Sequence, residues 1–181
     1  MKEKGLLTQS GEKKQRERYL LLFVVSFFGM MIAFLPTVIL NGGIFLYYGD
    51  FNSQQMMFYQ HANEMVRNGN LGWDWGTDLG ANFIGSYSFY LLGSPFFWLS
   101  FLFPASAFPY LVGWIYMLKY AVAGLTSFAY FRRSASEKSA LLGSVLYAFS
   151  GFSCINVVFY HFHDVIALFP LLMLGLDKRM Q

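Results

Sequence analysis

Charged residues are scarce in this chain: Asp, Glu, Lys and Arg make up 13% of its 181 residues, against about 25% in a typical soluble domain. Hydrophobic residues make up 56% and aromatic residues 20%, which is more apolar material than one compact core of this size can bury. An ordinary cytosolic enzyme is therefore excluded, and so is a disordered chain beyond the polar amino-terminal tail. The composition predicts an integral membrane protein.

Cysteine is nearly absent, because only Cys154 occurs and it lies in an apolar run. A single cysteine excludes an intrachain disulfide and a cysteine-based zinc site. The sequence also lacks a glycine-rich phosphate loop, a nucleophile elbow, a His-Glu-x-x-His motif and any nucleic-acid-binding motif. Any chemistry must therefore come from single polar residues in an apolar setting.

Three runs with almost no charge are long enough to cross a bilayer as helices. They cover residues 19–41, 109–131 and 139–160, and the only charged side chain in them is Lys119. A helix of about 22 residues is about 33 Å long, and the hydrocarbon core is about 30 Å thick. A shorter apolar run, 165–176, is predicted to form a short fourth span. The predicted fold class is an all-α membrane protein with about four transmembrane helices.

The basic residues orient these spans. With the tail, residues 1–18, on the cytoplasmic side, 11 of the 13 Lys and Arg residues lie inside, as the positive-inside rule requires. The loop 132–138 and the end 177–181 are then cytoplasmic, and the turn 161–164 is on the outer side. This arrangement predicts a multi-pass protein with a cytoplasmic amino terminus.

Residues 42–108 are predicted to form one long extracytoplasmic segment. Within it, an amphipathic helix at 52–68 gathers its apolar residues on one face, so it either lies along the membrane surface or packs onto neighbouring elements. The apolar run 86–104 is too broken to span the membrane, because a Ser-Pro pair near its middle suits the start of a short helix. We expect an interfacial or re-entrant helix at 94–103.

Two single charged residues carry the strongest functional signals. Asp50 follows the first span closely, so it can either cap the 52–68 helix or act as a general base on a headgroup at the outer face. Capping is the simpler interpretation from the residues alone. Lys119 lies near the middle of its span, where an ionisable group is costly and indicates a functional site by default. An anionic partner such as a phosphate would stabilise it.

Two further clusters allow more than one interpretation. His161, His163 and Asp164 lie on the outer turn, where imidazole and carboxylate groups can bind a divalent metal or can simply form a polar turn. Trp73 and Trp75 flank an aspartate and suit the water–lipid boundary, although a sugar-stacking platform would use the same rings. The interface preference of tryptophan favours anchoring.

An ordered series of short motifs runs through the chain after its tail. It consists of Gly49-Asp50, Gln54, Trp73 to Trp75, Gly80-x-Asn82-Phe83, Tyr90, Ser94-Pro95-Phe96, Phe103-Pro104, Lys119, Ala123-Gly124-Leu125, Ser150-Gly151-Phe152 and Pro170-Leu171. In this order the motifs resemble the start of the bacterial YfhO family. YfhO proteins are much longer, so the chain resembles the amino-terminal portion of one.

The resemblance implies a function. The YfhO family is similar to the membrane glycosyltransferases of the C-type fold, which take sugars from polyprenyl phosphates on the outer face of the bacterial cell membrane. The implied reaction moves a sugar from such a donor to a cell-envelope polymer, such as lipoteichoic acid. The first outer loop of that fold carries an essential acid, so the resemblance assigns Asp50 as the general base rather than a helix cap. A second acid often lies in the next outer loop of that fold, and Asp164 is the only candidate for it here.

The resemblance also implies the substrate contacts. A cation near the leaving phosphate would stabilise its charge, which suits Lys119 or Arg67, and Trp73, Trp75 and Asn82 are expected to contact substrate. The implied partners are the lipid bilayer, the lipid-linked sugar donor and the polymer acceptor, and a divalent metal cofactor stays open. Two rival classes are a multi-spanning transporter or flippase, which also uses mid-membrane charges and broken helices, and a non-catalytic assembly subunit.

Overall fold

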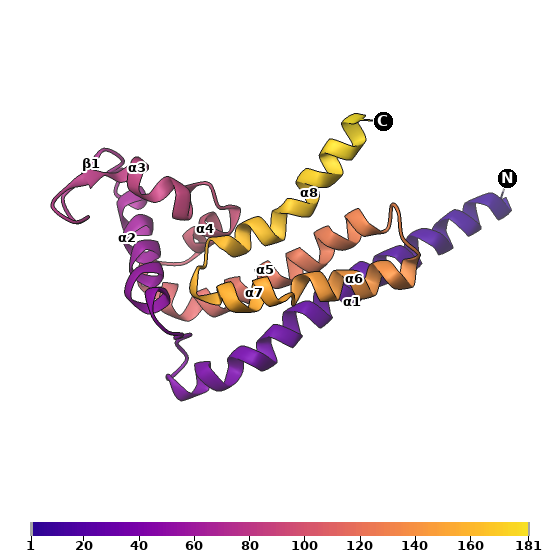
Figure 1. The fold of residues 1–181 in the computed structure, drawn as a ribbon, viewed down its shortest axis with the longest axis horizontal. Helices are drawn as coiled ribbons and strands as arrows, with labels where there is room; N and C mark the ends of the chain where they lie inside the picture. The colour runs from indigo at the N-terminus through magenta and orange to yellow at the C-terminus, as the bar shows by residue number, and fades with distance from the viewer. Residues whose placement is uncertain (1, 181) are drawn as a thin grey trace.

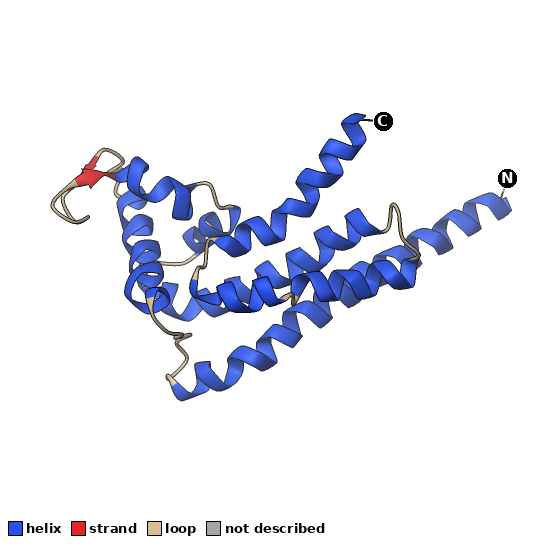
Figure 2. Cartoon of the chain, in the orientation of Figure 1, coloured by secondary structure: helices blue, strands red, loops and turns tan. Residues whose placement is uncertain are grey.

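Helices make up nearly all of the structure, a computed structural model that describes residues 2–180, with side chains from residue 11 onward (Figure 2). Long helices run together as a bundle, and shorter ones gather at one end of it (Figure 1). Within this described part, three stretches are long and apolar enough to cross a membrane: Gly11–Leu40, Ala105–Phe131 and Glu137–Val158. The predicted all-α membrane fold is confirmed.

The packing of α1 (Lys2–Leu40) against α5 (Phe108–Phe131) forms the centre of the bundle. The two helices approach closely at Gly124, where an added Cβ atom would lie 2.6 Å from Oγ of Ser26. Small residues allow such close approach in membrane proteins, where lipid provides no hydrophobic force between helices.

The predicted third span, 139–160, is not one continuous helix. It is divided into α6 (Glu137–Ala148), α7 (Gly151–Ile155) and the 3₁₀ turn η5 (Asn156–Val158). Ser150 begins α7 by accepting a hydrogen bond from a backbone amide in its first turn. Ser is a strong helix-capping residue because its hydroxyl satisfies an amide that the helix itself leaves unpaired. The Ser-Gly step in the sequence is therefore the point where the helix restarts.

Tyrosine hydroxyl groups from α5 satisfy the backbone of this broken helix. Tyr120 Oη donates to the carbonyl of Ser153 at 3.0 Å, and Tyr116 Oη donates to the carbonyl of Val157 at 2.7 Å. A backbone carbonyl without a partner is costly at membrane depth, and irregular backbone is tolerated there only where protein covers it. The two tyrosines therefore make the break possible.

The last helix, α8 (Phe162–Met180), begins earlier and ends later than the short span predicted at 165–176. It packs on α5 and then diverges from the bundle toward its carboxyl end (Figure 1). It is not among the three candidate spans of the described chain, since it carries four charged residues: Asp164, Asp177, Lys178 and Arg179.

A proline inside α8 is compensated by side chains from neighbouring helices. Pro170 has no backbone N–H, so the carbonyl of Ile166 lacks its helical donor. Tyr147 Oη donates to that carbonyl at 3.0 Å, and Thr126 Oγ1 donates to the carbonyl of Ala167 at 2.7 Å. These two bonds attach α8 to α6 and α5.

The predicted extracytoplasmic segment folds as a series of short elements between α1 and α5. Residues 41–107 are called the outer segment below, because most of their elements lie beyond one end of the bundle. They are the π-helical turn η1 (Phe51–Gln55), α2 (Met56–Arg67), β1 (Trp73–Asp74), β2 (Ala81–Asn82), α3 (Phe83–Tyr87), η2 (Ser88–Leu92), α4 (Pro95–Leu99), η3 (Ser100–Leu102) and η4 (Ala105–Ala107). Figure 1 shows most of them gathered beyond the bundle end, with β1 and α3 farthest out.

The helix predicted at 52–68 is present as η1 and α2, and Gly69, with a φ of +72°, follows its end. Its apolar face is covered by protein, since Phe51 and Ala62 on that face are fully buried. Of the two expected environments for this face, packing onto neighbouring elements is the one observed. The helix predicted at 94–103 begins with Ser94 Oγ accepting from the amide of Phe97 at 3.2 Å.

A buried aspartate holds the small hairpin formed by β1 and β2. Asp74 is 3% exposed and accepts hydrogen bonds from Thr77 Oγ1 at 2.6 Å and from the amide of Gly76 at 2.8 Å. Its Oδ2 atom also lies 2.5 Å from Nε2 of His61 on α2. Burial favours a raised pKa for Asp74, but the hydrogen bonds from Thr77, His61 and Gly76 outweigh it, and the pKa lies below its ordinary value.

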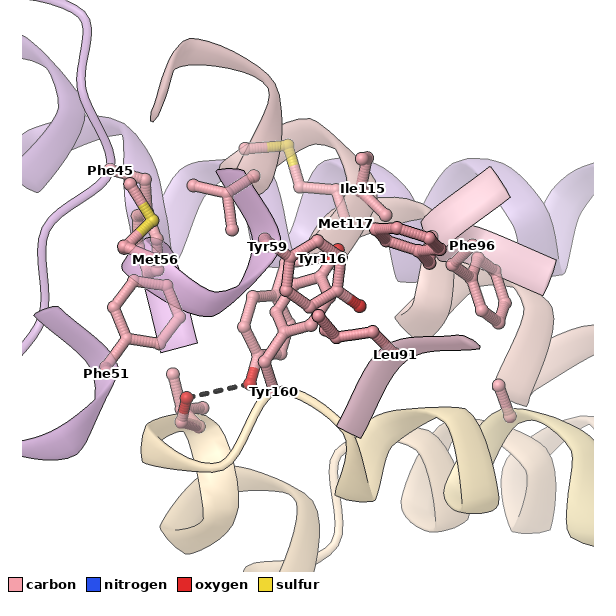
Figure 3. Packing of buried hydrophobic residues seen from close by; sticks show 14 of the residues in the cluster. Phe45, Phe51, Met56, Tyr59, Leu91, Phe96, Ile115, Tyr116, Met117 and Tyr160 are labelled. Atoms are coloured by element: carbon pink, nitrogen blue, oxygen red, sulfur yellow. Dashed lines mark hydrogen bonds between the residues drawn. The ribbon is translucent and has the colours of Figure 1, made fainter. Parts of the chain in front are cut away.

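An aromatic core joins the outer elements to the bundle. Tyr160 packs edge-to-face with Tyr59 of α2 at 4.6 Å and with Tyr116 of α5 at 4.7 Å between ring centroids (Figure 3). Phe45 and Phe51 extend the same cluster. Aromatic pairs in this geometry contribute about 0.5–1.5 kcal/mol beyond the burial of their surface. The core therefore fixes the outer segment on the end of α5.

The amino-terminal part of α1 and the loop after α5 lie at the end of the bundle opposite to the outer segment (Figure 1). Arg132 donates to Gln15 at 3.2 Å, and Arg18 forms an ion pair with Glu137. Two of the three regions predicted to be cytoplasmic are thus neighbours. Which side of the membrane they occupy stays a prediction.

Candidate functional site

Lys119 is paired with an acid inside the bundle. Its side chain is 0% exposed, and its Nζ atom lies 2.9 Å from Oδ1 of Asp164. Lys119 also donates a hydrogen bond to the carbonyl of Tyr160 at 2.9 Å, and its ammonium group lies 3.2 Å from the centroid of the Tyr160 ring. The anionic partner that the position of Lys119 demands is therefore supplied by the chain itself.

The break between α6 and α7 determines the position of Asp164. The chain leaves η5 and turns through Tyr160 and His161, so that Asp164 falls in the first turn of α8, close to the middle of α5. A carboxylate is stabilised near a helix amino terminus by the unpaired amides there. Asp164 remains 13% exposed. Lys119 is therefore inaccessible, and Asp164 is the member of the pair that a ligand can contact.

The side chain of His163 forms a hydrogen bond with the protein backbone rather than facing a ligand site. Its Nε2 atom lies 2.9 Å from the carbonyl of Ser153, which can only accept, so Nε2 carries the proton. Its other nitrogen, Nδ1, lies 3.3 Å from the hydroxyl of Tyr116. His163 thus completes the tyrosine network that supports the broken helix.

His161 faces a different set of partners. Its Nδ1 atom lies 3.3 Å from Oε1 of Gln55 in η1, and its ring packs against Phe89 at 5.0 Å and Tyr90 at 4.9 Å between centroids. The structure therefore does not bring His161, His163 and Asp164 together as a set of ligands. Among the described side chains, residues 11–180, no group of three or more His, Cys, Asp or Glu is placed to hold a metal ion.

An apolar groove lies beside the ion pair. It encloses about 420 Å³, and its polar end is formed by Ser94, His161 and Asp164. Its wall is formed by residues of η2, of the turn that follows it and of α8: Phe89, Gly93, Val165, Leu168, Phe169 and Leu172. A groove with polar groups at one end and apolar groups along its length suits a ligand with a headgroup and a hydrocarbon chain.

Asp50 is exposed and makes no capping hydrogen bond to η1. Asn52 closes this loop instead, because its side chain accepts from the amide of Tyr47 at 2.9 Å and donates to the carbonyl of Tyr47 at 2.8 Å. The carboxylate of Asp50 is therefore not used in capping. Asp50 does not line the groove, and it is brought into no contact with Lys119 or Asp164.

Arg67 is used to close the outer segment on itself. Its guanidinium group donates to the carbonyls of Phe101 at 2.9 Å and Phe103 at 2.5 Å, and to Asn63 Oδ1 at 2.6 Å. Asn63 in turn donates to Ser100 Oγ at 2.7 Å. These contacts connect α2 with the end of η3, and a substrate contact for Arg67 stays a prediction.

The predicted aromatic contacts lie at the exposed tip of the outer segment. Trp73 is 58% and Trp75 is 78% exposed, with their rings edge-to-face at 5.8 Å. Asn82 caps α3 by accepting from the amide of Gly85 at 2.7 Å. Gly80, with a φ of +106°, lies beneath the two tryptophans, where an added Cβ atom would be 2.8 Å from Nε1 of Trp73. The tip is thus built to hold both rings outward.

Sequence reasoning identified Lys119 and Asp164 separately but did not pair them. A signal for the pairing exists, because only Glu137, Asp164 and Asp177 are acidic after Lys119, and Asp164 alone falls on the predicted outer turn. The pairing of His61 with Asp74 was also missed. Thirteen residues separate these two side chains in the sequence, and no local motif joins them.

These features define an all-α membrane protein in which a buried lysine on a candidate membrane-spanning helix is paired with an acid beside an apolar groove. The chain belongs to a family described as bacterial membrane protein YfhO, which it matches over residues 22–181. The match confirms the resemblance indicated by its motifs. No curated protein and no solved structure matches the chain.

Proposed function

We propose that this chain takes part in transferring a sugar from a polyprenyl-phosphate donor to a cell-envelope polymer, such as lipoteichoic acid, on the outer face of the membrane. The observation that carries the proposal is the groove beside the ion pair of Lys119 and Asp164. Its apolar wall on α8 suits a prenyl chain, and its polar end suits the sugar phosphate. Membership of the YfhO family supports a glycosyltransferase-like role.

The chemistry proposed is a direct displacement. An acceptor hydroxyl oxygen forms a bond to the anomeric carbon of the sugar, while the bond from that carbon to the phosphate oxygen breaks. The hydroxyl proton passes to the carboxylate of Asp50, and polyprenyl phosphate leaves with the electron pair. Asp50 is proposed as the general base, and its exposed carboxylate is not occupied by a helix cap. Because Asp50 does not line the groove, this role requires the sugar of the bound donor to extend beyond the groove to reach it.

Lys119 is proposed as the cation that meets the charge developing on the phosphate. The structure sets a condition on this role, because Lys119 is fully buried behind Asp164. Binding of the donor then requires Asp164 to shift, so that the ammonium group exchanges one anion for another. Asp164 would act as the reversible partner that keeps Lys119 charged when no donor is bound.

Sugar transfer in membranes containing the protein tests the proposal. With a labelled polyprenyl-phosphate sugar and an envelope-polymer acceptor, Asp50→Asn should reduce transfer at least a hundredfold while donor binding is retained. Asp177→Asn, at the far end of α8, is the matched control and should transfer normally. Full activity of a folded Asp50→Asn protein would refute the base assignment. Lys119→Met with unchanged donor affinity would refute the phosphate role.

A transporter or flippase is the second candidate, favoured by one observation. The helix between Glu137 and Val158 is broken, and its carbonyls contact the buried side chains of Tyr116, Tyr120 and His163. Broken helices are also a feature of transporters. Proteoliposomes loaded with a labelled lipid-linked sugar separate the two functions. Movement of the lipid across the bilayer without transfer to an acceptor would favour the transporter.

A further inference from the structure

A second pocket lies in the outer segment, apart from the groove. It encloses about 460 Å³ between α2, the hairpin and α3, and its chemistry comes from six residues: Phe58, His61, Glu64, Thr77, Asp78 and Tyr87. It shares no lining residue with the groove on α8. Its volume falls in the range of small-molecule sites, about 300–1,000 Å³.

The hairpin holds His61 in one orientation on the wall of this pocket. Nε2 of His61 lies 2.5 Å from Oδ2 of Asp74, whose carboxylate is already fixed by Thr77 and the amide of Gly76. Because Asp74 accepts all three contacts as a carboxylate, Nε2 carries the ring proton. In the neutral ring, Nδ1 is then left as a hydrogen-bond acceptor. The imidazole is thus oriented by a buried acid.

The backbone at Gly76 approaches the imidazole of His61 closely. An added Cβ atom there would lie 3.0 Å from Cε1 of His61 and 3.2 Å from Oδ1 of Asp74. Both distances are shorter than ordinary contacts. Gly76 also lines the pocket, so the close approach that seats His61 also keeps this part of the wall open.

The charges of the residues that line the pocket restrict which ligands it can bind. Glu64 and Asp78 line the pocket, and no Lys or Arg is among the lining residues. Carboxylates accept hydrogen bonds from hydroxyl groups, but they repel anions. The rings of Phe58 and Tyr87, which meet edge-to-face at 5.2 Å, add an apolar surface. The lining therefore suits an uncharged organic ligand with hydroxyl groups.

We propose that the pocket of His61, Glu64, Thr77 and Asp78 binds an uncharged, hydroxyl-rich ligand, a sugar or polyol unit, and rejects the same unit when it carries a phosphate. The carboxylates and Nδ1 of His61 accept from the ligand hydroxyls, while Phe58 contacts its apolar face. The site lies outside the groove, so binding there does not depend on the transfer reaction. An anionic polymer is recognised at this site only through its uncharged sugar or polyol substituents.

The test uses the purified protein in lipid nanodiscs and two matched probes, glucose and glucose 6-phosphate. Saturation-transfer NMR titrations should show glucose binding, with glucose 6-phosphate at least tenfold weaker. The double variant Glu64→Gln with Asp78→Asn should bind glucose at least fivefold more weakly and lose most of the discrimination against the phosphate. Asn is chosen at position 78 because the φ there is 50°, and Asn tolerates that region.

Asp177→Asn is the control for a lost charge outside the pocket and should keep both affinities. Thermal unfolding of each variant shows whether the fold is retained. Equal or tighter binding of glucose 6-phosphate to the wild-type protein would overturn the proposal, and so would the absence of glucose binding. A folded double variant that still rejects the phosphate as strongly as wild type would also overturn it. None of these outcomes depends on sugar transfer.

Discussion

Two acid–base pairs, one in the bundle and one in the outer segment, are built in opposite ways. In the bundle the base is hidden: Lys119 is 0% exposed and Asp164 is 13% exposed. In the outer segment the acid is hidden: Asp74 is 3% exposed and His61 is 31% exposed. In each pair one side chain is buried and the other stays partly exposed. The partly exposed side chain, Asp164 or His61, is the one that lines a cavity.

The difference follows from the surroundings of each pair. At membrane depth a lysine has no water to reach, so an acid and a carbonyl must satisfy it. In the outer segment water is close, and the buried carboxylate of Asp74 is satisfied by amide, hydroxyl and imidazole donors. The first pair resists separation because a charge would be left in an apolar environment, while the second resists it through several hydrogen bonds.

The largest effect is expected from removing the acid of the bundle pair. Asp164→Asn leaves Lys119 fully buried without its acidic partner, and breaking such a pair costs about 3–5 kcal/mol. Lys119→Met should cost less, because Asp164 is partly exposed and can reach water. Denaturation in detergent micelles measures both changes. The double variant Lys119→Met with Asp164→Asn should recover most of the loss, and equal costs for the two single variants would contradict the asymmetry.

A smaller effect is expected from Asp74→Asn. The amide keeps a similar shape, but it cannot accept from Gly76, Thr77 and His61 together, and the expected loss is about 1–3 kcal/mol. Because Asp74 anchors only the hairpin, hydrogen exchange should increase around residues 73–82 and on α2. Exchange in α5 should stay unchanged. Loosening that spreads equally through the bundle would show that the two regions are not independent.

Acid should reproduce the loss of Asp74 in the wild-type protein. The pKa of Asp74 is lowered in the folded protein from an ordinary value of 3.8, so its stabilising contribution is fully present above that value. The contribution declines as the pH falls through the lowered pKa. Limited proteolysis of the outer segment between pH 5 and pH 2 should show cleavage increasing only at the acid end. The Asp74→Asn variant should be cleaved at all these pH values without that dependence.

The smallest effect is expected where a single hydroxyl supports the backbone. Tyr147→Phe removes the donor to the carbonyl of Ile166 and should cost about 0.5–1.5 kcal/mol. In a Pro170→Ala background the helix itself supplies an N–H to that carbonyl, so the same change should cost little. A double-mutant cycle in the detergent denaturation assay measures the difference. Identical costs in the two backgrounds would show that Tyr147 acts by packing alone.

Particular residues show how far the sequence could predict this protein. The spans and the short helix at Ser94 followed from uncharged runs and from local capping chemistry. The division of 139–160 into two helices was not predicted, because its stability depends on Tyr116 and Tyr120 from another helix. Asp50 offered both a capping and a catalytic interpretation, and only the structure shows that Asn52 closes the loop instead.

The sequence by itself determined the membrane class, the YfhO family and the approximate positions of the long helices. These depend on composition, on uncharged runs and on an ordered series of motifs, all of which are local properties of the chain. Only the tertiary structure decided which ionisable side chains pair: Lys119 with Asp164, and His61 with Asp74. The physical reason is that burial makes an unpaired charge costly. The partner that removes this cost is chosen by proximity in space rather than in the sequence.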